Sequence, residues 1–131
     1  MGKKPLFMDI DCLSLKVGDL EAAIAFYAGK LGQELKWKTP TSAGLRFPNG
    51  GSELVLHTEK RPPGTDLLVE SVSDAVRRFE EAGGNLVYGP VEIPVGSFAI
   101  VADPWGNRLT VLDLSKGTYR VDADGNVIGV G

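Results

Sequence analysis

The chain has 131 residues, enough for one compact domain, and its content of 43% hydrophobic and 24% charged residues is ordinary for a globular protein. The net charge is −3 and the 14 basic residues form no long run, which argues against a nucleic-acid binder. No apolar run is long enough to span a membrane, the start does not fit a secretory signal, and the single cysteine cannot form an intrachain disulfide. We therefore expect a cytoplasmic protein.

The first 58 residues predict a strand, a helix and three further strands. Residues 10–15 form a strand-like run, with Leu13 and Leu15 on one side and Cys12 and Ser14 on the other. An amphipathic helix is predicted to begin at Asp19 and to end at Gly32. Three strand-like runs follow, namely ELKWK, AGLRF and SELVLHT. The apolar stripe of the predicted helix consists of Leu20, Ala23, Ile24, Tyr27 and Leu31.

The second half of the chain repeats this pattern. A second amphipathic helix, VSDAVRRFEE, is followed by a glycine pair and by the strand-like runs NLVYGPVEI, SFAIVA and NRLTVLDL. Leu20 corresponds to Val72 and Tyr27 to Phe79, a constant offset of 52 positions. The chain therefore contains two tandem β-α-β-β-β units, over residues 8–58 and 64–115. Pairing two such units is the expected way to bury the open face of each sheet.

Two motifs relate the chain to a known family. The signature V-x-D-L-x-x-A-I-x-F-Y, from Val17 to Tyr27, and the hairpin D-P-W-G-N-R-L, from Asp103 to Leu109, resemble the vicinal oxygen chelate superfamily. That group includes glyoxalase I, extradiol dioxygenases and the bleomycin-resistance proteins, and the resemblance covers roughly residues 8–115. It implies a single α+β domain over residues 1–131, with eight strands in a half-open cup, helices on the convex face, and a ligand site inside the cup.

The resemblance also indicates where a metal would bind. Metal-dependent members place one ligand, usually His or Glu, on the first and last strand of each unit. Strand alternation and the repeat offset assign these positions to Cys12, Val55, Gly64 and Thr110. Valine and glycine have no side-chain donor, and one thiolate alone cannot fix a site that needs three or four ligands. We therefore expect no metal and no cofactor, and the acidic residues before Cys12 are interpreted as the start of a strand.

Polar residues share the inward side of the predicted cup with these positions. His57, the single histidine, has three interpretations: a solvated strand-end residue, a hydrogen-bonding residue or general base in the pocket, or part of a displaced metal site with Glu53 and Asp66. Glu53 and Arg108 are either rim charges or the polar anchors of a ligand. Cys12 is a small buried group or a catalytic thiol. The predicted ligand-binding residues are Cys12, Ser14, Trp37, Glu53, Val55, His57, Arg108 and Thr110.

Three functions are compatible with these features. The favoured hypothesis is a metal-free small-molecule binding protein of the glyoxalase or bleomycin-resistance type, acting as a homodimer. The alternative is an enzyme, either a glyoxalase-like lyase or isomerase that uses His57 and Glu53 as an acid–base pair, or a dioxygenase-like metalloenzyme whose site has moved. The third is an interaction module without a ligand of its own.

The C-terminal segment TYRVDADGNVIGVG lies beyond the repeats. It predicts a β-hairpin over residues 118–131 with Asp124-Gly125 as a two-residue type I′ turn, which sets Ala123 opposite Asn126. Asp122 and Asp124 resemble the start of a calcium loop, but the third acidic ligand and the distal glutamate of such a loop are absent from the segment. An isolated hairpin is marginally stable in water, so we expect its apolar face to dock on the barrel or on a second subunit, with Trp105 as a candidate neighbour.

Overall fold

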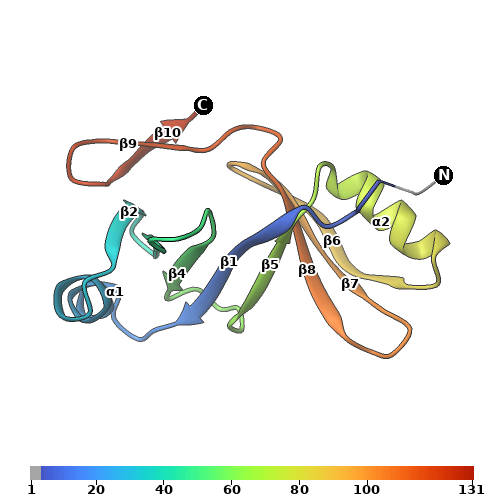
Figure 1. Ribbon diagram of the computed structural model, residues 1–131, viewed down its shortest axis with the longest axis horizontal. Coiled ribbons are helices and arrows are strands. Elements are labelled where there is room, and N and C mark those ends of the chain that lie inside the picture. The colour runs from blue at the N-terminus through green and yellow to red at the C-terminus, as the bar shows by residue number, and fades with distance from the viewer. Residues whose placement is uncertain (1–3) are drawn as a thin grey trace. The chain divides into compact units, whose positions relative to one another are not determined.

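The computed structural model describes residues 4–131. It has mixed α+β structure, with two helical segments, eight strands in the two predicted repeats and a two-stranded C-terminal hairpin (Figure 1). The elements in chain order are β1 (Asp9–Lys16), α1 (Leu20–Ile24), η1 (Ala25–Lys30), β2 (Glu34–Lys38), β3 (Ser42–Arg46), β4 (Glu53–His57), β5 (Gly64–Leu68), α2 (Val72–Glu81), β6 (Asn85–Ile93), β7 (Gly96–Ala102), β8 (Arg108–Asp113), β9 (Tyr119–Val121) and β10 (Val127–Val130). This confirms the predicted α+β class and the order of elements in both repeats.

Contacts within the chain divide the described residues into two compact units. The first unit comprises residues 11–64 together with residues 119–129 and 131. The second unit comprises residues 4–10, residues 65–118 and residue 130. The C-terminal hairpin therefore packs with the first repeat, although it follows the second repeat in the sequence.

In the first unit the strands lie in the order β2-β3-β4-β1, with β1 and β4 parallel and the other neighbours antiparallel. Leu54 and Leu56 of β4 face the helix and pack with Leu20 and Ala23 of α1 in one buried cluster. Leu15 of β1 packs against the same cluster. These contacts confirm the predicted alternation of β4, because its even-numbered residues face the helix and its odd-numbered residues face the other side of the sheet.

The first helix differs from the prediction in its second half. Asp19 caps the helix as expected, since its carboxylate accepts a hydrogen bond from Ala22 N at 3.1 Å. After Ile24 the chain continues as a π-helix, in which Leu31 N donates to Phe26 O at 3.0 Å, five residues back. The wider turn rotates later residues relative to an α-helix. Leu31 was therefore wrongly predicted as part of the buried stripe, because 57% of its surface is exposed.

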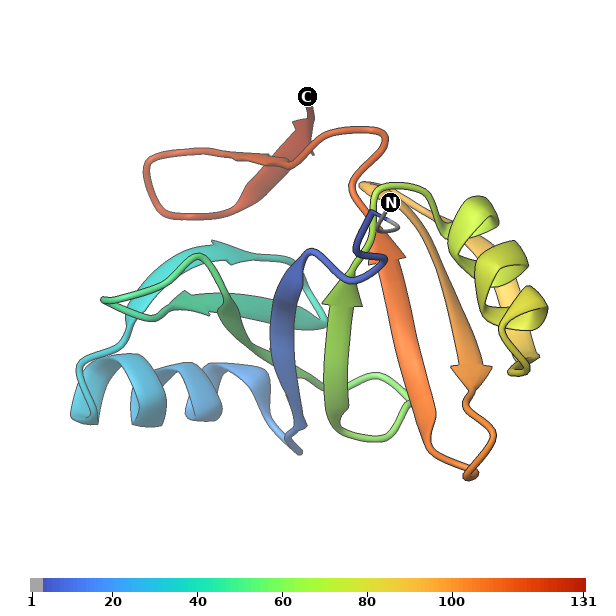
Figure 2. The ribbon, with the colours of Figure 1, turned by 45° about the vertical axis from the view of Figure 1, so that its right-hand side comes forward.

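The second unit has the corresponding order β5-β8-β7-β6, with β5 and β8 parallel. Helix α2 begins after Ser71, whose hydroxyl accepts a hydrogen bond from Asp74 N at 3.3 Å, and it lies against β6, β7 and β8 (Figure 2). Val72 and Phe79 of α2 pack in the buried cluster of this unit. Their counterparts, Leu20 of α1 and Tyr27 of η1, pack in the buried cluster of the first unit. The offset of 52 positions therefore relates the cores of the two units.

A buried carboxylate joins three segments of the second unit. Asp113, only 4% exposed, accepts hydrogen bonds from Val72 N at 2.8 Å, from Ser97 N at 3.1 Å and from Ser115 Oγ at 2.8 Å. Burial by itself raises the pKa of Asp113, but the hydrogen bonds from Val72 and Ser115 outweigh it, so the pKa lies below its usual value. Asp113 thus fixes the start of α2 to the end of β8 and the start of β7.

The C-terminal hairpin forms, but its turn is not the predicted one. Asp122 N donates to Asn126 O at 3.0 Å, so Asp122 and not Ala123 lies opposite Asn126. Gly125 has a φ of 86°, and none of the described residues other than glycine has a positive φ, which excludes a type I′ turn at Asp124-Gly125. The turn therefore has three residues between the closing pair. This pairing is shifted by one residue from the predicted pairing, so different side chains share a face of the hairpin.

None of the described residues belongs to a helix that is long and apolar enough to cross a membrane.

We predict that Asp113→Asn lowers the free energy of unfolding at pH 7 by about 1–3 kcal/mol, because an amide cannot accept all of these hydrogen bonds. The depressed pKa of Asp113 contributes stability that is present above about pH 4 and is lost as the pH falls through the folded-state pKa. The difference between the variant and the wild type should therefore shrink in acid. Urea unfolding at pH 7 and pH 3 measures this, with Asp124→Asn as an exposed control. An equal difference at both pH values would contradict the assignment.

Candidate functional site

The face of the first unit that points away from α1 carries a small apolar cluster. Cys12 of β1, Trp37 of β2 and Val55 of β4 are buried together, with 5%, 8% and 6% of their surfaces exposed. Tyr119 and Val127 of the C-terminal hairpin pack against them. We call these five residues the Trp37 cluster. Three of the predicted ligand-binding residues therefore lie together, and the hairpin covers them.

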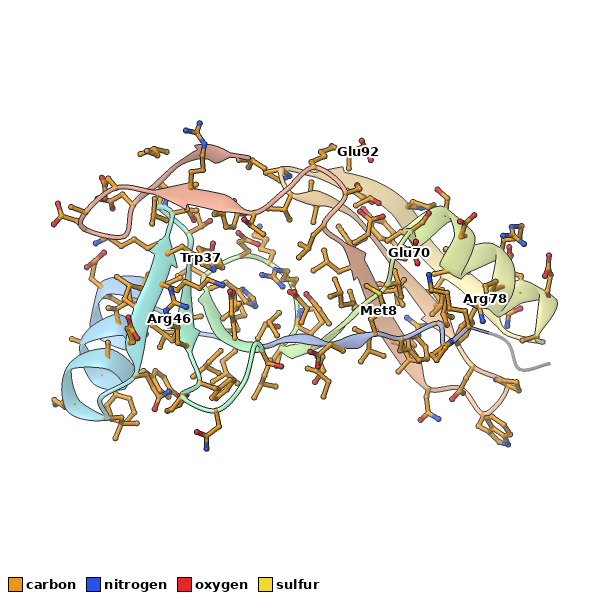
Figure 3. All side chains as sticks on the ribbon, turned by 45° about the horizontal axis from the view of Figure 1, so that its top comes forward. Met8, Trp37, Arg46, Glu70, Arg78 and Glu92 are labelled. Carbon is orange, nitrogen blue, oxygen red and sulfur yellow. The ribbon has the colours of Figure 1, made fainter. Side chains whose placement is uncertain are left out.

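The indole of Trp37 is held on several sides. Its Nε1 donates a hydrogen bond to Glu53 Oε1 at 2.9 Å, and the ring of Tyr119 lies with its centroid 4.8 Å from that of Trp37 at an interplanar angle of 51°. Gly44, its cross-strand partner on β3, leaves room for the ring, because a Cβ at this position would lie 2.1 Å from Trp37 Nε1. Figure 3 shows Trp37 on the side of β2 that the hairpin approaches.

A β-bulge determines which way Trp37 points. Leu35 pairs with Leu45 and Trp37 pairs with Gly44, so one extra residue is inserted on β2 between the two pairs. Leu35 packs with the cluster beneath α1, whereas Trp37 lies on the opposite face of the sheet. Two residues that regular alternation would place on one face are thereby separated.

Glu53 accepts hydrogen bonds from both Trp37 and Lys36. Its second oxygen, Oε2, accepts a hydrogen bond from Lys36 Nζ at 2.6 Å, and its side chain is 17% exposed. Both carboxylate oxygens are therefore engaged within the first unit. In this arrangement Glu53 orients the indole of Trp37 and is not free to act as a general base.

His57 is the most unusual polar residue of the described part of the chain. It is completely buried, and neither ring nitrogen has a hydrogen-bond partner. The interpretation of His57 as a solvated strand-end residue is therefore wrong. Burial lowers its pKa and the Arg61 cation lowers it further, whereas the carboxylate and the main chain of Glu59 raise it. His57 is thus mainly a neutral imidazole at pH 7.

Charged groups surround the same end of β4. Glu59 accepts hydrogen bonds from Thr41 Oγ1 at 2.9 Å and from Arg61 Nε at 3.0 Å. Burial raises the pKa of the Tyr119 phenol, and the carboxylates of Glu59 and Glu53 raise it further. The phenol of Tyr119 therefore stays protonated and lies within the electrostatic reach of both carboxylates.

The remaining predicted site residues have other surroundings. Ser14 is 2% exposed, and its hydroxyl is used by the main chain of Gly64: it donates to the carbonyl and accepts from the amide, both at 3.2 Å. Thr110 and Arg108 belong to β8 of the second unit, where Thr110 is half-buried and Arg108 is exposed. Thr110 pairs with Asp66 on β5.

The residues at the metal-ligand positions of the family do not fit a metal ion. Val55 and Gly64 supply no side-chain donor, Thr110 supplies a neutral hydroxyl, and Cys12 is packed among apolar groups. Over residues 4–131, no three His, Cys, Asp or Glu side chains are grouped so that they could hold a metal ion. The displaced site of Glu53, His57 and Asp66 is therefore not supported by the positions of these side chains.

Two surface depressions lie outside the Trp37 cluster. One, of about 370 Å³, belongs to the first unit and is lined by Gly32, Gln33, Glu34, Arg46, Phe47, Pro48 and Gly50. The other, of about 180 Å³, belongs to the second unit and is lined by Lys4, Pro5, Leu6, Glu70, Ser71, Asp74, Arg77 and Arg78. Neither contains a residue of the predicted ligand site.

The fold and the two repeated units define a glyoxalase-type α+β protein. The sequence profile of the Glyoxalase/Bleomycin resistance protein/Dioxygenase superfamily matches residues 9–111, well over half of the chain. The chain therefore belongs to this superfamily, which confirms the resemblance found in the sequence. A comparison with curated proteins gives no match.

Solved structures show the same fold at low sequence identity. Methylmalonyl-CoA epimerase from Mycobacterium tuberculosis is 21% identical with a TM-score of 0.66, over 86% of this chain and 92% of that chain. A structure described as NAD-dependent benzaldehyde dehydrogenase from Legionella pneumophila is 19% identical with a TM-score of 0.65, over 79% and 97%. Homoprotocatechuate 2,3-dioxygenase from Brevibacterium fuscum, in complex with 3,4-dihydroxyphenylacetate, is 20% identical with a TM-score of 0.60, over 84% and 37%.

The contribution of the hairpin to this face was not predicted from the sequence. Trp105 was the expected neighbour of the hairpin, whereas the aromatic partner of Tyr119 is Trp37. Trp105 itself is 84% exposed at the tip between β7 and β8. Gly44 opposite Trp37 was an available signal, since a glycine inside a strand often marks the close approach of another group.

We predict that Gly44→Ala displaces the indole of Trp37 and lowers the free energy of unfolding by about 1–3 kcal/mol, the usual cost of overpacking. Gly64→Ala is the matched control, because a Cβ at this strand position meets nothing within 4 Å. Trp37 can be observed alone in a Trp105→Phe background, since the chain has two tryptophans. Increased acrylamide quenching of Trp37 in Gly44→Ala alone is the expected result. Equal quenching in both variants would contradict the packing described here.

The lowered pKa of His57 predicts a pH dependence of stability. A histidine whose pKa is depressed in the folded state contributes stability that is complete above its unfolded pKa of about 6.5 and is lost as the pH falls toward the folded-state pKa. Because His57 is the single histidine, His57→Gln should flatten the change in unfolding free energy between pH 7 and pH 5. Urea denaturation at several pH values measures the slope, and an unchanged slope would show that His57 titrates normally.

Proposed function

We propose that the protein binds a small molecule without a metal, on the face of the first unit formed by Cys12, Trp37, Val55 and His57. The observation that carries the proposal is the fully buried imidazole of His57, whose two nitrogens have no partner. Leaving a buried polar group unsatisfied costs about 1–3 kcal/mol. A ligand that hydrogen-bonds to His57 recovers this cost.

The composition of the face supports the same proposal. Trp37 and Val55 supply apolar surface, and Glu53 and His57 supply polar groups beside it. Binding sites for small molecules commonly combine mostly apolar walls with a few placed polar groups. The donor set at the family's metal positions gives no reason to include a metal ion. A stoichiometric transition metal that survives dialysis of protein purified without chelator would overturn the metal-free part of the proposal.

An enzymatic role is the second candidate, and the lowered pKa of His57 favours it. A neutral imidazole at pH 7 can accept a proton from a bound substrate, as the general base of a glyoxalase-like lyase or isomerase does. Glu53 would have to leave Trp37 or Lys36 before it could serve as the partner acid or base. If the protein converts a bound compound, and His57→Gln abolishes this conversion but retains binding, the protein is an enzyme and not only a binding protein.

We further propose that the protein acts in the cytoplasm as a homodimer and without a nucleic-acid partner. The reduced single cysteine and the net charge of −3 support the compartment and the absence of a nucleic-acid partner. The frequency of twofold homodimers among oligomers supports the assembly. Light scattering coupled to gel filtration tests the dimer, and a monomeric mass at micromolar concentration would reject it.

The test of the binding face uses Val55→Trp, which places a large side chain within the Trp37 cluster. A thermal-shift screen first identifies a compound that stabilises the wild type, and a ligand at 100 times its dissociation constant stabilises a protein by about 2.7 kcal/mol. Val55→Trp should lose this stabilisation, whereas Val87→Trp, at an exposed position of β6, should keep it. Normal stabilisation of a folded Val55→Trp variant would show that the compound binds elsewhere.

A further inference from the structure

We propose that the C-terminal hairpin, residues 119–129, is a displaceable lid, and that Tyr119 occupies the place where a planar aromatic ring of the ligand stacks on Trp37. This inference rests on the proposed binding face and adds to it the chemical class of the ligand and the step that admits it. The observations behind it are the few attachments of the hairpin, the shape of the space beside Trp37 and the position of the Tyr119 ring.

The hairpin is attached to the rest of the first unit at few points. Its main chain meets a repeat strand at an isolated bridge between Lys38 and Asn126, where Lys38 N donates a hydrogen bond to Gly125 O at 2.8 Å. Tyr119 and Val127 add side-chain contacts to the Trp37 cluster. A two-stranded hairpin is marginally stable alone, and segments with few buried contacts open at low free energy. Such a segment can leave the face while both sheets stay folded.

The outer side of the hairpin makes little contact. Val121 is 39% exposed and Ile128 is 60% exposed, so these apolar residues do not hold the hairpin in place. The link before the hairpin contains Gly117, whose φ is 120°. Because only glycine adopts such a conformation readily, this position is suited to a change of backbone direction.

The space that Tyr119 fills suits a flat ring. The indole of Trp37 is fixed by Glu53 through Nε1 and by the proximity of Gly44, so its orientation does not depend on Tyr119 alone. When the hairpin leaves, the indole presents an apolar face at a fixed angle. Aromatic rings recover stacking contacts there that an aliphatic group of the same size does not.

The geometry beside Trp37 sets the ligand class. The centroid of the Tyr119 ring lies 4.8 Å from that of the indole, and a ligand ring that replaces Tyr119 would occupy the same position. The ligand class is therefore a planar aromatic compound, and 2-naphthol is a suitable probe.

Competition between Tyr119 and the ligand has a measurable consequence. If the closed hairpin excludes the ligand, the apparent dissociation constant is the intrinsic constant divided by the open fraction. Removing the Tyr119 ring should then tighten binding, whereas removing an ordinary wall of a binding site weakens it. The direction of the change distinguishes a lid from a wall.

The first experiment measures 2-naphthol binding to the full chain by equilibrium dialysis. Tyr119→Ala should lower the apparent dissociation constant at least about fivefold, and the matched control Tyr88→Ala, an exposed tyrosine of the second unit, should leave it unchanged. In a Trp105→Phe background, acrylamide quenching of Trp37 should increase with Tyr119→Ala. Weaker binding by Tyr119→Ala would overturn the inference, because Tyr119 would then be part of the wall.

The second experiment locks the hairpin. A double variant, Lys38→Cys with Asn126→Cys, places two cysteines at bridge partners, and peptide mapping confirms that they pair with each other and not with the buried Cys12. The oxidised protein should bind 2-naphthol at least tenfold more weakly than the same protein after reduction. Equal affinity in the two states would show that the hairpin need not move.

The two proposals fail in different ways. If neither the wild type nor Tyr119→Ala binds 2-naphthol while both remain folded, the aromatic class and the lid are wrong, but a compound found by the screen can still bind the face. If Tyr119→Ala binds 2-naphthol and the double variant with Val55→Trp binds it equally well, the proposed face is wrong.

Discussion

Each repeat of this protein has one helical segment for a four-stranded sheet, and most features of the first unit follow from that constraint. One helix covers one face of a sheet, as α1 does over Leu54 and Leu56. The opposite face carries Cys12 and Val55, apolar groups that water would otherwise contact. In the first unit the C-terminal hairpin covers them. The cover is therefore supplied by a segment outside the repeat, which makes it separable from the fold in a way that α1 is not.

On this face, the free-energy cost of leaving buried polar atoms without hydrogen bonds falls on one residue, His57. Glu53, Ser14 and Asp113 are partly or fully buried, yet each uses its polar atoms within its own unit. His57 has the deeper burial and no such partner. Since native proteins pair nearly all of their buried polar groups, the exceptions are informative about function. Of the three odd-numbered residues of β4, Glu53 and Val55 have side chains that make contacts within the first unit. The third, His57, has ring nitrogens without a hydrogen-bond partner.

The sequence predicted the parts of the fold that follow from periodicity and failed where a local irregularity intervened. Regular alternation placed Leu54, Val55 and Leu56 on their correct faces, and the offset of 52 positions related Leu20 to Val72. No residue pattern marks the π-helical turn that rotates Leu31 outward, so the sequence does not predict it. The bulge that turns Trp37 away from Leu35 depends on pairing with β3, which no single strand reveals. The burial of His57 also depends on distant segments, so its position at a strand end was misleading.

The C-terminal turn shows why the hairpin behaves as one body. Residues 103–107 and 122–126 share the pattern D-x-x-G-N, and in both the aspartate Oδ1 accepts hydrogen bonds from two main-chain amides, those of Trp105 and Asn107 or of Asp124 and Asn126. The asparagine side chain closes each turn by donating to Oδ2, and the glycine takes a positive φ. These bonds are local, so they persist whether or not the hairpin touches Trp37. A segment that is internally fixed and externally held at few points moves by rotating about its link, because that motion breaks the fewest interactions.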